Sequence, residues 1–158
     1  MIKQSYFSIF RKLAAVMAKT KLTLEIEYDY EFILIGISCH CRDYKLCWAI
    51  NKQLGFSLTK DADMELPIKK NQMATVFSRF SHFDEDKRLS YMLISNKGTN
   101  DYLLPEQKKH ADYLFKIEGN MSETEQQEFV SQLKQIDLIQ LAFVIDVQEL
   151  KSKQNLLF

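Results

Sequence analysis

The chain has 158 residues, of which 46% are apolar and 27% are charged, with only four glycines and two prolines. This length and composition predict one ordered domain with a buried core and exclude a collagen-like or largely disordered protein. Basic and acidic residues both number 21, so the chain lacks the basic surplus that general nucleic-acid binding requires.

The first sixteen residues, MIKQSYFSIFRKLAAV, are interpreted as an N-terminal extension before a single domain at residues 17–158. Arg11 and Lys12 interrupt the apolar run, so the stretch has neither the core of a signal peptide nor the length of a membrane span. Its apolar side chains would share one face of a short helix, suited to docking on the domain, a partner or a membrane surface. Alternatively, Met17 is the natural start of the chain.

Residues 22–32 show the strongest pattern in the sequence, a strict alternation of apolar and polar side chains that predicts a β-strand. The run is long for one strand, so we expect a bent strand or two segments. The uninterrupted apolar residues that follow, 32–37, predict a strand buried on both faces. The polar face carries four carboxylates, interpreted as a solvated strand face.

Residues 42–55, RDYKLCWAINKQLG, predict a helix, because Leu46, Ile50 and Leu54 follow helical spacing. Gly55 supplies the left-handed stop, and Asp43 or Ser38 is expected to cap the helix start. The segment after this helix predicts a short strand and then a charged loop. Residues 74–83 and 88–95 predict a hairpin joined by the turn DEDK, and NKGTND predicts a second turn.

The last third of the chain repeats the order strand, helix, strand. DYLFKIEG, residues 112–119, predicts a strand, and Ser122 with Glu125 forms a capping box before a helix whose Phe129, Leu133 and Ile136 share one face. LIQLAFVID predicts another strand, followed by a short polar helix and an apolar tail. The whole order predicts an α+β fold, a mainly antiparallel sheet with two main helices on one face, ferredoxin-like or an elaboration of it.

The three cysteines, Cys39, Cys41 and Cys47, lie within nine residues. An odd, clustered set without a secretory signal predicts reduced thiols and a cytoplasmic protein. Zinc ligands normally come in pairs two to four residues apart, so CHC is a poor metal motif, and we expect no metal and no cofactor. A reactive thiolate at Cys39 or Cys41 would need an imidazole from elsewhere, such as His82 or His110, and buried core thiols are the preferred interpretation.

Two stretches are the candidate ligand-binding positions. A strand end that leads into a helix start presents backbone N–H groups beside Arg42 and Asp43, where an anion or small ligand would bind, although a ligand-free cap explains the same pattern. In LPEQKKHADY, residues 104–113, Glu106, Asp112 and Tyr113 are candidate ligand-binding residues in a loop. The alternative, which we prefer, is a turn set by Pro105 before a strand.

Other binding motifs are weaker. The four glycines are isolated, so no P-loop or dinucleotide fingerprint occurs. The aromatic residues of the predicted hairpin lie among basic side chains, as on a platform for single-stranded nucleic acid, but an ordinary aromatic-rich hairpin is favoured without a basic surplus.

The chain resembles the bacterial IPExxxVDY family of proteins of unknown function. The resemblance rests on LPEQKKHADY, FILIGISCHCRDYKLCWAINKQLG, FSRFSHFDED with YMLISNK, and LKSKQNLLF, and covers about residues 17–158. The chain has four residues between its Leu-Pro-Glu and Ala-Asp-Tyr where the family pattern has three. The resemblance implies a cytoplasmic bacterial protein and supplies no catalytic residues.

These observations predict a non-catalytic binding or interaction module that associates with itself or with a protein partner through its sheet or sheet edge. A small-ligand-binding regulatory domain is the alternative, motivated by the two strand-helix-strand halves and by Arg42 and Asp43. A thiol-dependent enzyme is the third hypothesis. Nucleic-acid binding and a transmembrane segment are not expected.

Overall fold

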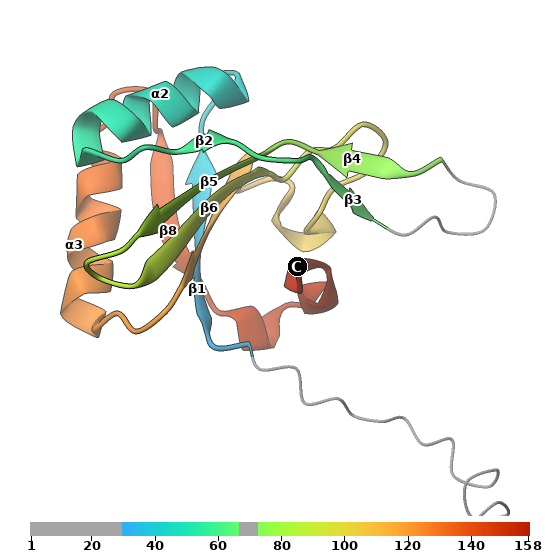
Figure 1. Ribbon diagram of the computed structural model, residues 1–158. Helices are drawn as coiled ribbons and strands as arrows, with labels where there is room; N and C mark the ends of the chain where they lie inside the picture. Colours follow the sequence, from blue (N-terminus) through green and yellow to red (C-terminus); the bar gives the residue numbers. More distant parts are fainter. Residues whose placement is uncertain (1–29, 67–72) are drawn as a thin grey trace, which may run out of the picture.

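The computed structural model describes residues 30–66 and 73–158 (Figure 1). The predicted extension at residues 1–16 and most of the alternating segment at residues 22–32 lie outside these ranges. The α-helices are α2 (Asp43–Leu54) and α3 (Glu123–Lys134), and three short 3₁₀ helices are η1 (Pro105–Gln107), η2 (Val147–Glu149) and η3 (Lys153–Leu156). The strands are β1 (Phe32–Ser38), β2 (Thr59–Lys60), β3 (Met64–Leu66), β4 (Thr75–Phe77), β5 (Arg79–Asp84), β6 (Leu89–Ser95), β7 (Tyr113–Glu118) and β8 (Leu141–Ile145).

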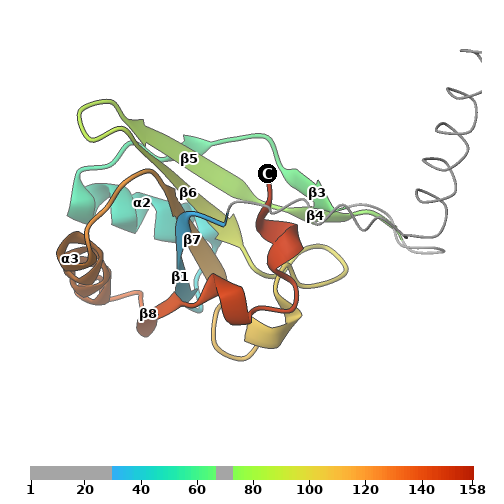
Figure 2. The same ribbon diagram turned by 90° about the horizontal axis from the view of Figure 1, so that it is seen from below.

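Six strands form one antiparallel sheet in the order β2-β5-β6-β7-β1-β8, and β3 pairs with β4 in a separate two-stranded sheet. The predicted α+β class with a mainly antiparallel sheet is confirmed. The chain runs from β1 through α2 to the β2 edge and returns strand by strand to β7, and α3 then leads to the opposite edge at β8 (Figure 2). Strand β1 therefore lies between β7 and β8, which explains its continuous apolar sequence.

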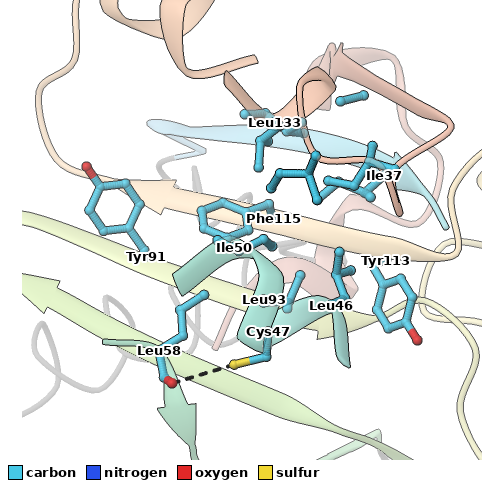
Figure 3. Packing of buried hydrophobic residues seen from close by; sticks show 14 of the residues in the cluster. Ile37, Leu46, Cys47, Ile50, Leu58, Tyr91, Leu93, Tyr113, Phe115 and Leu133 are labelled. Carbon is cyan, nitrogen blue, oxygen red and sulfur yellow. Dashed lines mark hydrogen bonds between the residues drawn. The ribbon is translucent and has the colours of Figure 1, made fainter. Parts of the chain in front are cut away.

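Both α-helices cover the same face of the sheet, as predicted (Figure 1). Their buried side chains, such as Ile50 and Leu133, pack against Ile37 and Phe115 of the central strands (Figure 3). Every second residue of a strand points to this face.

The opposite face of the sheet has a second apolar cluster, covered by the segment between β6 and β7 and by the last residues of the chain. Leu34 and Leu114 of the sheet belong to this cluster with Leu104, Leu150 and Leu156. Two apolar layers thus bury the central strands on both sides, and the C-terminal 3₁₀ segments complete the second layer.

The predicted strand at residues 74–83 is in fact two strands, because the chain changes sheets at Ser78. β4 pairs with β3, which lies in the segment predicted as a charged loop, whereas β5 pairs with β2 and β6. The backbone N–H of Ser95 donates to Ser78 O, so β6 still holds the chain at the break. The turn DEDK connects β5 and β6 as predicted.

The two helix starts differ. α3 has the predicted capping box, in which Ser122 and Glu125 bond each other's backbone N–H groups. The predicted side-chain cap of α2 is wrong, because its N-cap is Arg42, which makes no side-chain capping bond, and Ser38 still belongs to β1. Gly55 ends α2 in the left-handed conformation, with φ of 67°, as predicted.

Candidate functional site

The turn between β1 and α2 meets the start of β7 at one end of the sheet. The Asp112 carboxylate accepts a hydrogen bond from the backbone N–H of Cys39 at 2.9 Å. The next residue, Tyr113, donates its hydroxyl to Cys41 O. Two adjacent predicted site residues therefore fasten the backbone of the β1–α2 turn.

Asp112 also holds this end of the sheet through its backbone, which donates to Ile37 O and accepts from the N–H of Asn96. Its carboxylate lies 3.9 Å from Nδ1 of the exposed His40. Burial and the neighbouring Cys41 and Asp43 raise the pKa of Tyr113 above its usual range. Tyr113 therefore stays a protonated donor at neutral pH.

Glu106 lies in a different place, in η1, where its two carboxylate oxygens accept hydrogen bonds from the backbone N–H and the hydroxyl of Ser152, both at 2.9 Å. Burial raises the pKa of Glu106, but the hydrogen bonds from Ser152 outweigh it and hold the pKa below its usual value. Glu106 thus ties the loop before β7 to the C-terminal segment.

Asp112 and Tyr113 therefore bond the backbone of the turn that leads into Arg42 and Asp43, whereas Glu106 lies apart and bonds Ser152. The contacts of Asp112, Tyr113 and Glu106 are with the protein's own backbone and with Ser152. The cavities considered below are lined by other residues. Ligand binding at these positions stays a prediction.

Two of the three thiols are buried, and the environment of each favours the neutral form. Burial and a hydrogen bond with Cys41 raise the pKa of Cys39 to about 12. Burial, with the neighbouring Asp43, also raises the pKa of Cys47, whose Sγ lies 3.5 Å from Leu58 O. A thiolate is the reactive form of cysteine, so neither buried thiol is activated at neutral pH. Over residues 30–66 and 73–158, no three His, Cys, Asp or Glu side chains form a group suited to a metal ion.

The outer edge of β8 is a feature whose position in the sheet the sequence did not predict. In the described part of the chain, β8 pairs with β1 alone, so the backbone groups on its outer side have no strand partner there. Its sequence, LAFVI, contains neither charge nor proline, and Leu141 and Val144 are 46% and 52% exposed. The uncharged composition was visible in the sequence, but not the position of the strand at the edge.

The opposite edge of the sheet is different. β2 has only two residues, Thr59 and Lys60, both exposed. A short edge strand that carries lysine resists pairing with another chain. Of the two edges of the six-stranded sheet in the described residues, β8 is therefore the one whose length and apolar character suit strand pairing.

Two cavities are relevant to ligand binding. The larger, about 850 Å³, lies beside the start of β1 and the loop between β7 and α3, and its walls include Tyr30, Phe32 and Glu118. A smaller cavity of about 250 Å³ lies between α3 and the β5–β6 hairpin, and we call it the hairpin cavity. Its walls include Phe56, Tyr91 and Phe129, with Lys87, Glu125 and Glu128.

No described helix is long and apolar enough to cross a lipid bilayer. Comparisons of the chain with models of protein families, with curated proteins and with solved structures found no match.

Proposed function

We propose that the protein is a non-catalytic interaction module that associates with a second copy of itself through β8. The observation that carries this proposal is the contrast between the two sheet edges, of which β2 is short and charged and β8 is longer and uncharged. An unprotected edge strand offers unpaired N–H and C=O groups to a further strand.

The exposed side chains of β8 also favour a second copy of the chain as the partner. Leu141 and Val144 point to opposite faces of the sheet, because side chains alternate along a strand. In an antiparallel pair of two β8 strands related by a twofold axis, each exposed side chain would meet an apolar side chain of the other copy. A twofold pair is also the commonest symmetry of homo-oligomers.

The association is expected to depend on concentration. Each β8 has five residues, whereas a standard interface contains roughly 20–30 residues a side, and smaller interfaces form weaker complexes. Sedimentation velocity over a range of concentrations should therefore show a monomer–dimer equilibrium of the full chain.

The variant Val144→Lys tests the role of β8. Val144 is half exposed, so a lysine there leaves the core intact but adds a charge beside the same charge in a paired strand. We expect Val144→Lys to be a monomer at concentrations where the wild type is a dimer. The matched control is Phe83→Lys, which removes a 58% exposed apolar side chain from β5 and should leave the dimer intact.

A wild-type chain that is monomeric at its highest soluble concentration would contradict self-association. A dimer that Val144→Lys does not weaken would show that another surface forms it. Removal of residues 1–16 distinguishes a third outcome, because a dimer that appears only after this deletion would mean that the chain's own N-terminal residues occupy the edge.

The other two hypotheses have less support. The thiol-dependent enzyme would use Cys39 or Cys41 as an activated thiolate, and burial raises the pKa of Cys39. A ligand site at Arg42 and Asp43 would have to share the turn with the contacts that Asp112 and Tyr113 already make to its backbone. Membership of the IPExxxVDY family and a cytoplasmic location remain proposals that rest on the sequence.

A further inference from the structure

The hairpin cavity is lined by Tyr91, whose ring is buried and whose hydroxyl has no hydrogen-bond partner among the described residues. Tyr91 is only 1% exposed, and its hydroxyl makes no hydrogen bond with any residue of the described ranges. In Figure 3 this hydroxyl points away from Phe115 and from the rest of the apolar cluster. The hydroxyl oxygen is not sealed from solvent, so it is free to exchange a hydrogen bond with a ligand or a water molecule in the cavity.

Three aromatic rings form the apolar wall of the cavity. The ring centroids of Phe56 and Tyr91 are 4.5 Å apart, and Phe129 lies 6.0 Å from Phe56 and 5.9 Å from Tyr91. Such rings pack favourably against the ring of a further aromatic molecule.

The charged side chains that line the cavity favour a cation. They are Glu125, Glu128 and Lys87, so the lining carries an excess of one negative charge. Burial raises the pKa of Tyr91, and the carboxylates of Asp84 and Glu125 raise it further. The Tyr91 hydroxyl is therefore neutral and lies in a field that attracts positive charge.

The size of the cavity sets the size of the ligand. A cavity of about 150 Å³ is known to hold a benzene ring, so one of about 250 Å³ suits a single ring with a short side chain. From these observations we propose that the hairpin cavity binds a small aromatic amine, with its ring against Phe56 and Phe129 and its ammonium group at the Tyr91 hydroxyl and Glu128.

Three ligands of the same shape test the charge preference. 2-Phenylethylamine, 2-phenylethanol and phenylacetate present an ammonium, a hydroxyl and a carboxylate on similar frames. Titration of the ¹⁵N-labelled full chain at neutral pH should show that the amine binds about tenfold more tightly than the alcohol, as expected for a charge-assisted contact. Phenylacetate should bind least, and the shifted amide signals should belong to Leu89, Tyr91, Met121 and Phe129.

Two variants assign the contacts. Tyr91→Phe keeps the ring and removes the hydroxyl, and Glu128→Gln removes the charge from an exposed position of α3, so both should fold. Each should weaken amine binding several-fold while leaving the affinity for the alcohol less changed. Glu149→Gln, a carboxylate outside the cavity, is the control and should bind the amine like the wild type.

The proposal is overturned if the amine does not bind, if the three ligands bind equally, or if Tyr91→Phe and Glu128→Gln both leave amine binding unchanged. It is also overturned if the shifted signals lie away from α3 and the β5–β6 hairpin. None of these outcomes depends on the oligomeric state, so they are independent of the β8 proposal.

Discussion

Asp112 shows how a residue in a candidate binding motif is used to hold the backbone. Its carboxylate accepts the N–H of Cys39, the first residue after β1, while its own N–H donates to Ile37 O. The side chain thus continues the pairing of β1 with β7 beyond the last strand residue. This hydrogen bond accounts for the acidic residue at position 112, and no bound ligand is needed to explain it.

Asp112→Ala is therefore expected to destabilise the fold. Loss of the carboxylate leaves the Cys39 N–H without its acceptor, and a hydrogen bond of this kind contributes about 1–2 kcal/mol to the free energy of unfolding. Asp112→Asn keeps an acceptor oxygen and should lose less. Urea unfolding measures both variants, and an unchanged midpoint for Asp112→Ala would mean that the residue has another role.

Cys39 gives a prediction about pH. Its pKa is about 12 in the folded protein and 9.0 in the reference state, so the unfolded chain loses the thiol proton first as pH rises. The stabilisation is fully present below pH 9 and decreases between about pH 9 and 12, by at most about 1.4 kcal/mol per pH unit. Cys39→Ala should therefore show a shallower loss of stability than the wild type over this range. Equal slopes in the two proteins would contradict the assigned pKa.

At the scale of elements, Lys116 joins β7 to the end of the chain. It is 2% exposed, and its Nζ lies 2.9 Å from Leu156 O and 2.7 Å from the Glu118 carboxylate. The same ammonium lies 4.5 Å and 4.4 Å from the ring centres of Phe32 and Phe158. The carbonyl oxygen, the carboxylate and the two aromatic ring faces together replace the water that a lysine loses on burial.

Lys116→Met tests this junction, because methionine keeps much of the apolar stem and removes the charge. The Leu156 carbonyl loses its donor, and no buried charge remains, because Glu118 is half exposed. We expect a loss of about 1–3 kcal/mol in the free energy of unfolding and faster hydrogen exchange in η3.

The matched control is Lys151→Met, since Lys151 is an exposed lysine of the same C-terminal segment. It should leave both stability and exchange unchanged. If the backbone amides of η3 exchange as slowly in Lys116→Met as in the wild type, Lys116 does not hold the C-terminal segment on the sheet.

The sequence predicted the elements whose signals are local. Ser122 with Glu125 marked the start of α3, Gly55 marked the end of α2, and the apolar run after residue 31 marked β1. The buried position of Lys116 had no local signal, because the Leu156 carbonyl and the Phe158 ring that contact it are distant in the sequence.

At the scale of the whole molecule, the α+β class followed from the order of elements, but the sheet edges and the second sheet did not. Which strand lies at an edge depends on pairings between distant residues, such as Gly36 with Phe143. The break at Ser78 likewise depends on β3 and β4 pairing with each other apart from the main sheet. The same reason explains the hairpin cavity, whose aromatic wall comes from three separate segments.

The position of β1 between β7 and β8 has a consequence for folding during translation. Ile35 is synthesised long before its strand partners Phe115 and Val144. This buried strand therefore keeps both of its edges open until β7 has been synthesised, and one edge open until β8 has been synthesised. Chains that stop before β8 would leave β1 paired on one edge only, a state that is prone to aggregation. The many strand pairings between residues distant in the sequence also predict slow refolding of the full chain.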